Sequence, residues 1–160
     1  MTISVGDTIP DIKLTYVLGD SVGEGSTLGL LGKGKVVLFA VPGAFTPTCS
    51  DYHLPGFVLR SEELAAKGVD TVACISVNDA FVMSAWGKSQ NVGSQVLLLA
   101  DGNAEFAEAI GLSLNASDWG MGKRSQRYAM ILEDGTVRSI SVEPDGGLSV
   151  SSADDVLAQL

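Results

Sequence analysis

A continuous apolar run at residues 36–41, V-V-L-F-A-V, predicts a strand that is buried on both faces. Stretches rich in apolar residues at 69–77 and 96–100 predict two further strands of the same sheet. Residues 3–14 alternate weakly between apolar and polar positions, which is typical of an edge strand. Residues 19–34 hold six glycines without apolar periodicity, so we expect a loop there.

A helical pattern follows the strand at residues 36–41. Thr46 or Thr48 is the expected N-cap, and Pro47 suits the first helical position because proline has no N–H to leave unpaired. Pro55 is expected to kink this helix and Gly68 to end it. The segment from Thr46 to Gly68 is therefore predicted to form one long, kinked helix.

Helical spacing returns at residues 80–88, after the capping residues Asn78 and Asp79. The residues expected on the inward face of this helix are Phe81, Val82, Ala85 and Trp86. A short helix is predicted at residues 105–110, and residues 113–124 are predicted to form a glycine-bearing loop around Trp119 and Met121.

The last part of the chain predicts a hairpin followed by a helix. Residues 128–132 and 136–142 flank the turn signature E-D-G. Ser152 and Asp155 have the spacing of a capping box at the start of a helix over residues 153–160. Together the elements predict an α/β fold with a central mixed β-sheet and helices on both faces, formed by residues 1–160 as one domain.

Composition and charge narrow the class of function. The net charge is −9 and the ten Lys and Arg residues form no run, so we expect no nucleic-acid partner. No apolar stretch is long enough to span a bilayer, and the N-terminus lacks the features of a secretory signal. A cytoplasmic location is the expectation, with an organelle as the alternative if a transit peptide was removed. We expect no cofactor and no metal site, because the two cysteines lack C-x-x-C or zinc-ligand spacing.

Cys49 is the residue whose setting points to chemistry. It follows the predicted strand and a Pro/Gly loop, in the first turn of the predicted helix. Free backbone N–H groups and the positive end of the helix dipole favour a thiolate there, which is the form that attacks. A small neutral molecule such as hydrogen peroxide would not be repelled by the acidic chain.

Two neighbours of Cys49 complete the pattern P-x-x-x-T-x-x-C. Thr46 lies three residues earlier, which places its hydroxyl beside the sulfur on one helical turn, where it can orient a bound oxygen. Pro42 has no N–H and can shield the thiolate from water. The plainer alternatives are a helix cap for Thr46 and a rigid loop residue for Pro42.

The stretch P-G-A-F-T-P-T-C-S, with H-L-P-G-F after it, resembles the active-site signature of peroxiredoxins of type II or V. Further likeness extends over R-S-Q-R-Y-A-M-I-L-E-D-G and V-E-P-D-G. The resemblance implies a thioredoxin-like fold, a peroxide substrate, and Cys49 as the peroxidatic cysteine. It also implies that Pro42, Thr46 and Arg127 complete the pocket, and that the chain forms a homodimer near the active-site loop, where Phe45 or Trp86 would be exposed.

The oxidised cysteine must be returned by a second thiol. The resemblance places one type of internal resolving cysteine just after E-P-D-G, where this chain has Val150. Cys74 matches the second cysteine of plant-like members, but its place within a predicted strand favours an inert, packed thiol. We therefore expect a one-cysteine cycle in which glutathione with glutaredoxin, or thioredoxin, supplies the resolving thiol.

His53 lies four residues after Cys49 and would face the same side of an unbroken helix. A structural role is favoured over that of a base, because Pro55 perturbs this geometry. Two other functions stay open at this point: a cysteine hydrolase that uses Cys49 and His53, and a redox-sensing binding module whose Cys49 is oxidised only once.

Overall fold

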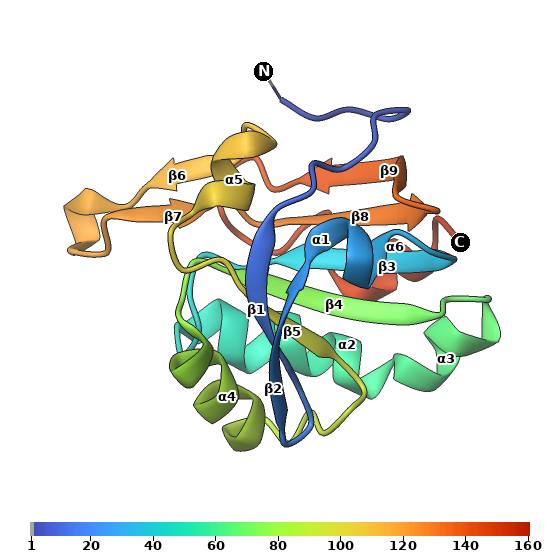
Figure 1. Cartoon of the computed structure of the whole chain (residues 1–160), viewed down its shortest axis with the longest axis horizontal. Coiled ribbons are helices and arrows are strands. Elements are labelled where there is room, and N and C mark those ends of the chain that lie inside the picture. Colours follow the sequence, from blue (N-terminus) through green and yellow to red (C-terminus); the bar gives the residue numbers. More distant parts are fainter. Residues whose placement is uncertain (1) are drawn as a thin grey trace.

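The computed structural model describes residues 2–160 and consists of a seven-stranded mixed sheet and a smaller two-stranded sheet (Figure 1). The order of the large sheet is β2-β1-β5-β4-β3-β8-β9, in which β3, β4 and β5 are parallel neighbours. The small sheet is an antiparallel hairpin of β6 and β7. The strands are β1 (Lys13–Leu18), β2 (Ser21–Ser26), β3 (Lys35–Ala40), β4 (Thr71–Ser76), β5 (Leu97–Ala100), β6 (Ser113–Asn115), β7 (Lys123–Ser125), β8 (Tyr128–Glu133) and β9 (Thr136–Val142).

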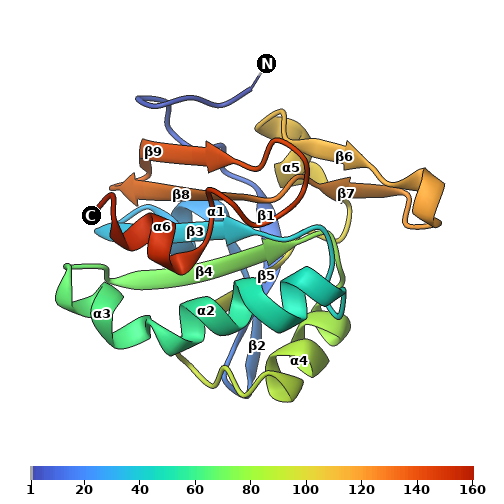
Figure 2. The same ribbon diagram turned by 180° about the vertical axis from the view of Figure 1, so that it is seen from behind.

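Helices cover both faces of the large sheet, which confirms the predicted architecture. Figure 2 shows α2, α4 and α6 on one face, and α1 and α5 lie on the other (Figure 1). The helical elements are α1 (Thr27–Leu31), the π-helical turn η1 (Cys49–His53), α2 (Leu54–Leu59), α3 (Ser61–Ala66), α4 (Ala80–Ser89), α5 (Glu105–Ala109), the 3-10 turn η2 (Ser117–Trp119) and α6 (Ala153–Leu157).

Strand β3 contributes to a separate hydrophobic core on each face of the sheet. Val37 and Phe39 pack on the face that carries α2 and α4, and Val36 and Leu38 pack on the face that carries α1 and α5. All four side chains are fully buried. This explains why the run at residues 36–41 is apolar at every position instead of alternating, since both faces of the strand exclude water.

The segment predicted as a loop at residues 19–34 instead forms β2 and α1. β2 is an edge strand that pairs with β1, and none of its residues is buried, so it carries no apolar pattern. At Gly23 a side chain would meet the ring of Tyr16, because an added Cβ would lie 2.7 Å from its hydroxyl oxygen. The glycines that suggested a loop therefore allow an aromatic ring to lie across the strand.

Two other predictions of local structure were wrong. The segment predicted as an edge strand at residues 3–14 forms a strand only from Lys13, and this strand, β1, lies inside the sheet between β2 and β5. Gly6 has a positive φ of 96° and Pro10 lacks an N–H, so the preceding residues make isolated contacts such as the Thr8–Thr136 bridge. The loop at residues 113–124 is the β6–β7 hairpin, whose three-residue strands are too short to show a period.

The long helix after residue 46 is divided differently from the prediction. It opens with the π-helical turn η1, in which the Leu54 N–H donates to the Cys49 carbonyl, and Pro55 follows within the first turn of α2 without a break. The break lies at Arg60, between α2 and α3. Gly68 has a positive φ of 88° just after α3, in agreement with its predicted role as the end of the helical segment.

Helix α4 buries a different face from the one predicted. Asp79 caps it through the Val82 N–H, and Met83 and Trp86 are buried, but Phe81 is 87% exposed and Ala85 is exposed. The inward stripe follows Met83, Trp86 and Gly87, where Gly87 allows close contact with Leu98. Phe81 therefore belongs to the surface.

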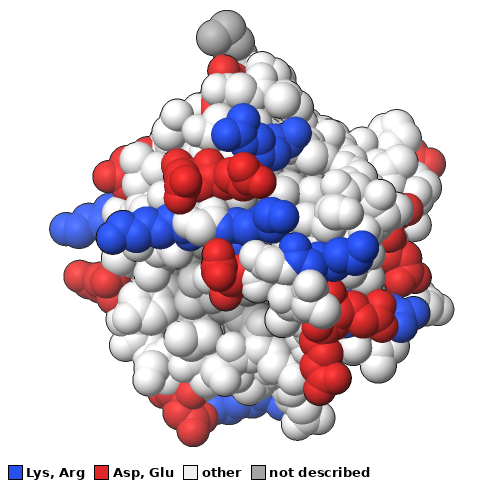
Figure 3. Space-filling model, turned by 90° about the vertical axis from the view of Figure 1, so that its right-hand side faces the viewer, with Lys and Arg blue, Asp and Glu red and all other residues white. Residues whose placement is uncertain are grey.

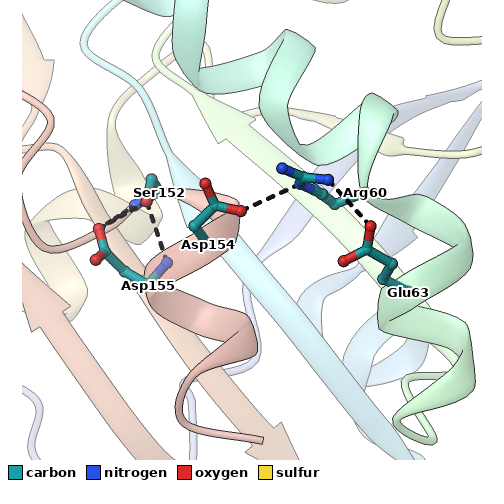
Figure 4. Close-up of polar contacts among 5 residues, drawn as sticks. All are labelled: Arg60, Glu63, Ser152, Asp154 and Asp155. Atoms are coloured by element: carbon teal, nitrogen blue, oxygen red, sulfur yellow. Dashed lines mark hydrogen bonds and ion pairs between the residues drawn. The ribbon is translucent and has the colours of Figure 1, made fainter.

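The predicted capping box at the start of α6 is confirmed: the Ser152 hydroxyl accepts from the Asp155 N–H, and the Asp155 carboxylate accepts from the Ser152 N–H (Figure 4). Arg60 joins α6 to the α2–α3 break through ion pairs with Asp154 and Glu63 (Figure 4). On this side of the molecule, Lys and Arg alternate with Asp and Glu (Figure 3).

Candidate active site

The loop that follows β3 carries the predicted chemistry to the end of the sheet. A hydrogen bond of 3.0 Å attaches this loop to the segment after β4: the Ala44 N–H donates to the side-chain oxygen of Asn78. Gly43 lies so close to the β6–β7 hairpin that an added Cβ would approach Met121 to 3.3 Å. Phe45 has a positive φ of 65°, a conformation that is uncommon for a residue with a side chain and that turns the chain into the following helix.

The sulfur of Cys49 accepts a hydrogen bond from Nη2 of Arg127 over 3.1 Å. Both side chains are buried, Cys49 completely and Arg127 with 3% of its surface exposed. A guanidinium is always protonated and has no acceptor, so its contact with the sulfur favours the thiolate. Within residues 2–160, the Cys49 side chain makes no other hydrogen bond.

Arg127 is held by two further acceptors. Its Nη1 donates to Nδ1 of His53 over 2.8 Å, and its Nε donates to the Gly146 carbonyl over 3.3 Å. Within residues 2–160, none of the carboxylates forms an ion pair with Arg127. The guanidinium therefore presents its charge to two neutral groups and to the sulfur.

His53 is neutral and fixed in one tautomer. Because Nδ1 accepts from Arg127, Nε2 carries the proton and donates to the Ser151 carbonyl over 2.9 Å. The ring lies beside Phe39 and Phe57, with centroid distances of 4.9 and 5.7 Å. Burial and then the charge of Arg127 lower the pKa of His53 from 6.5 to about 3. Both ring nitrogens are occupied, so His53 positions Arg127 and does not face the sulfur as a base.

The buried, neutral His53 predicts that stability falls in mild acid. Between its unfolded pKa of 6.5 and its folded pKa of about 3, the unfolded chain binds more protons. The free energy of unfolding should therefore be fully retained above pH 6.5 and fall by up to about 1.4 kcal/mol per pH unit below it. Urea unfolding between pH 7 and pH 5 measures this slope. His53→Gln should flatten it, and an equal slope in that variant would contradict the assignment.

Thr46 and Pro42 lie in the same loop but make different contacts. The hydroxyl of Thr46 donates to the Gly43 carbonyl over 2.6 Å and is half-buried. Within residues 2–160, neither the Thr46 nor the Thr48 hydroxyl accepts a hydrogen bond from a backbone N–H at the start of the helix, so the predicted threonine cap is wrong. Pro42 is half-buried and lies between the sheet and the hairpin.

A pocket of about 370 Å³ opens next to this cluster. Pro42 and Arg127 line it, as do Trp119 and Met121 of the β6–β7 hairpin. Trp119 is 73% exposed although it lines the pocket, whereas Trp86 is fully buried and donates to the Ser50 hydroxyl. Arg127 thus contacts the sulfur of Cys49 and also lines the pocket, so a small molecule in the pocket can reach the guanidinium.

Cys74 lies in the middle of β4, paired with Phe39 of β3 on one side and Leu98 of β5 on the other. It is a free thiol and completely buried, as is Cys49. Burial and the nearby charge of Cys49 raise the pKa of the Cys74 thiol well above its usual range. A buried thiol with a raised pKa is a poor nucleophile, so Cys74 suits a packing role.

The sequence did not predict the residues that hold Arg127 and His53 in place. These are Gly146 and Ser151 as acceptors, and Glu143, whose carboxylate accepts from the loop that contains them. The signal that was present is the cluster E-P-D-G followed by L-S-V-S-S, in which a carboxylate precedes a series of amide and hydroxyl donors. Arg124, which lies three residues before Arg127, donates to the Val77 carbonyl and not to the sulfur.

Comparisons with known proteins point to a single family. A family model described as Redoxin matches residues 4–157. The chain is 49% identical to Peroxiredoxin-2E, chloroplastic, of Arabidopsis thaliana over 99% of its own length and 70% of that protein. It is 47% identical to Peroxiredoxin-2B of the same organism over 99% of its length and 98% of that protein. The chain belongs to the peroxiredoxins.

A solved structure of this family supports the fold as well. The structure described as reduced Prx3 in complex with H2O2, from Vibrio vulnificus, superposes with a TM-score of 0.92 at 47% identity, covering 99% of this peroxiredoxin and 96% of that chain. The thioredoxin-like fold is thereby confirmed, and this peroxiredoxin is a thiol peroxidase with an antioxidant function. Its described helices include none long and apolar enough to cross a membrane.

Proposed function

We propose that Cys49 is the peroxidatic cysteine of this thiol peroxidase and that Arg127 stabilises its thiolate. The observation that carries the proposal is the hydrogen bond of 3.1 Å between the Arg127 guanidinium and the Cys49 sulfur. A permanent cation against a buried sulfur lowers the free energy of the thiolate relative to the thiol. Cys74 has burial without a comparable donor, so the two cysteines differ in the property that the reaction requires.

In the proposed reaction the Cys49 thiolate attacks the terminal oxygen of a hydroperoxide. An S–O bond forms while the O–O bond breaks, so the sulfur is oxidised by two electrons to a sulfenic acid. The departing oxygen receives the electron pair, takes a proton from solvent and leaves as water or an alcohol. Arg127 donates at the place where charge develops on the oxygens, and fixed donors of this kind lower the barrier.

Thr46 and Pro42 have supporting roles in the proposal. The hydroxyl hydrogen of Thr46 is committed to the Gly43 carbonyl, so its oxygen is available to accept a hydrogen bond from the terminal O–H of the peroxide. Pro42 lines the pocket next to Arg127 and offers no N–H, which keeps the approach to the thiolate apolar. His53 acts through Arg127: its Nδ1 accepts from Nη1 of the guanidinium, whereas the sulfur accepts from Nη2.

An external thiol is the proposed reductant. A glutathione thiol attacks the sulfenic sulfur and releases water, and a thiol of glutaredoxin then breaks the mixed disulfide and restores Cys49. Thioredoxin could serve instead through its own pair of thiols. An internal disulfide with Cys74 would require η1 to unwind towards a thiol in the centre of the sheet, whose pKa is raised by burial.

The variant Cys74→Ser tests this proposal, because it leaves Cys49 as the one thiol of the chain. It should consume hydrogen peroxide over many turnovers, at a rate within about twofold of the wild type, since Cys74 has no part in the proposed cycle. Glutathione with glutaredoxin and, separately, thioredoxin with its reductase should be supplied, and NADPH oxidation recorded. Sulfenic acid trapped with dimedone should be found on the Cys49 peptide.

The outcomes separate the parts of the proposal. Loss of turnover with both reductants, while Cys49 is still oxidised once, would show that Cys74 resolves the sulfenic acid. Turnover with one reductant alone identifies the physiological class of thiol. Many turnovers per chain would also exclude a purely sensing role, in which oxidation is stoichiometric.

The hydrolase alternative is disfavoured by the contacts of His53. A hydrolase would need a ring nitrogen of His53 to accept a proton from the Cys49 thiol. Both nitrogens are engaged elsewhere, and its pKa of about 3 makes the ring a weak base at neutral pH. An activated ester should therefore give no turnover without peroxide.

A homodimer and a cytoplasmic location remain predictions. Of the two residues expected at a dimer contact, Phe45 is 54% exposed and can take part, whereas Trp86 is buried and cannot. Sedimentation of the purified chain at the mass of a monomer would contradict the dimer. One relative is named chloroplastic, so cell fractionation is the measurement that decides between cytoplasm and organelle.

A further inference from the structure

Glu143 is a buried carboxylate next to the site, and its hydrogen bonds point away from Arg127. It is 4% exposed and accepts from the backbone N–H groups of Ser149, Val150 and Ser151 at 2.9 to 3.0 Å. The hydroxyls of Ser149 and Ser151 donate to it as well, over 2.8 and 2.7 Å. These contacts occupy both carboxylate oxygens with donors from a single loop, residues 143–151.

The same loop supplies two of the acceptors that define the active site. The Gly146 carbonyl accepts from Nε of Arg127, and the Ser151 carbonyl accepts from Nε2 of His53. Ser151 thus donates its N–H and its hydroxyl to Glu143 while its carbonyl fixes the His53 tautomer. The backbone of Glu143 is itself joined to the site, since its N–H donates to the Arg127 carbonyl over 2.9 Å.

The charge of Glu143 is the second part of the argument. Desolvation acts to raise the pKa of this carboxyl, but the hydrogen bonds from Ser151, Val150 and Ser149 outweigh it and lower the pKa to about 2. The group is therefore ionised at neutral pH. A buried carboxylate close to an arginine would ordinarily pair with it, yet Arg127 forms no ion pair within residues 2–160. The loop donors satisfy Glu143 and leave the guanidinium to the sulfur.

We propose that Glu143 is a positioning residue for peroxide reduction, which folds the loop of residues 143–151 so that Gly146 and Ser151 hold Arg127 and His53 against Cys49. This inference rests on the proposed roles of Cys49 and Arg127. Glu143 lies in the wall of the pocket, but its carboxylate accepts hydrogen bonds from the loop donors and makes none to the Cys49 sulfur, so it acts through the loop. The charged or titratable groups near Cys49 are Arg127, His53 and Cys74, which come from three separate segments of the chain.

The two effects that Glu143 exerts on Cys49 have opposite signs, which makes the proposal testable. If Glu143 acted through its charge alone, removing the charge would favour the thiolate, because a nearby negative charge disfavours another. If it acts by positioning Arg127, removing it disfavours the thiolate, because the guanidinium is no longer held against the sulfur. Whether removal of Glu143 favours or disfavours the Cys49 thiolate therefore distinguishes a positioning role from a purely electrostatic one.

The experiment compares Glu143→Gln with the parent in the Cys74→Ser background, where Cys49 is the one thiol. The glutamine amide would face backbone donors with a donor of its own, which opens the loop. We expect kcat/KM for hydrogen peroxide to fall about 10- to 100-fold, the cost of a misplacement near 1 Å. The pH at which the rate of Cys49 alkylation by iodoacetamide is half-maximal should rise. Glu143→Asp, which keeps the carboxylate, should recover part of both losses.

Two control variants separate positioning from general effects. Asp145→Asn removes a carboxylate from the same loop, where Asp145 is exposed and accepts from Gly147, and should leave the alkylation profile unchanged. Asp101→Asn alters a buried carboxylate that accepts from the backbone of Phe106 and Ala107, away from the loop. It should lower thermal stability without moving the profile. If Glu143→Gln does not fold, Ser151→Ala removes one donor and should move the profile upward by a smaller amount.

Different results would overturn the role of Glu143 and the proposed function of Cys49. An unchanged or lowered half-maximal pH in Glu143→Gln, with an active parent, overturns the positioning role alone. Peroxide turnover that persists in Cys49→Ser overturns the proposed function, whatever Glu143 does. An upward shift that is equally large in Asp145→Asn or Asp101→Asn would also overturn the inference, because the effect would then not depend on the loop contacts of Glu143.

Discussion

Replacement of Cys49 by serine should abolish thiol-dependent peroxide consumption. The serine hydroxyl is nearly isosteric and can still accept from Arg127, so the pocket and the sheet should be retained. A hydroxyl at neutral pH is not ionised and cannot form a sulfenic acid, so the rate should fall by about a thousandfold or more, to the background of free thiol. The measurement is peroxide loss in the presence of glutathione and glutaredoxin, or of thioredoxin.

The matched control is Cys74→Ser, which makes the same chemical change at the other buried cysteine. Thermal unfolding of both variants shows whether a loss of peroxide turnover is caused by a failure to fold. Cys49→Ser should keep a cooperative transition while losing turnover, and Cys74→Ser should keep turnover. Retained activity in Cys49→Ser would mean that the chemistry resides elsewhere in the chain.

The second large effect is expected for Arg127→Lys. The lysine keeps the charge, but its single ammonium cannot reach the sulfur, the His53 ring and the Gly146 carbonyl together, as the planar guanidinium does. Loss of one preorganised donor at a reacting centre typically costs about 100- to 1,000-fold in rate. Stopped-flow measurement of the first oxidation of Cys49 should show a decrease of that order.

Arg138→Lys is the comparison for Arg127→Lys, since Arg138 lies on the surface of β9 in an ion pair with Glu133. It should have little effect on the oxidation rate, because exposed ion pairs contribute little. A decrease confined to the recycling step, with normal oxidation of Cys49, would contradict the role proposed for Arg127. It would place Arg127 in contact with the reductant instead.

The local part of the site could be predicted from sequence, and the distant part could not. Pro42, Thr46 and Cys49 lie within eight residues, so their spacing alone brings them to one loop and one helical turn. Arg127 reaches the sulfur because β8 pairs antiparallel with β3, with Tyr128 opposite Ala40. No local period encodes that pairing, and only the resemblance to a family singled out Arg127 in the sequence.

The errors in the fold have a common physical origin. The strand predictions succeeded where both faces are buried, as in β3, because burial leaves a continuous apolar run. They failed for β2 and for the β6–β7 hairpin, whose edge position and short strands leave one buried residue, Ser125, and so no apolar pattern. Phe81 was assigned to the core of α4 for the opposite reason, since an apolar side chain at helical spacing need not be buried when another face of the helix packs better.

The proposed role of Cys49 has a consequence for synthesis, because the thiol meets Arg127 only after β3 pairs with β8. Cys49 leaves the ribosome long before Arg127 and the loop that holds it, and the antiparallel register that joins them cannot form until β8 is present. The nascent chain therefore carries two ordinary cysteines. If Cys49 has the proposed role, we expect sensitivity to peroxide to arise only with the completed tertiary structure, because the topology keeps Arg127 away from the thiol until then.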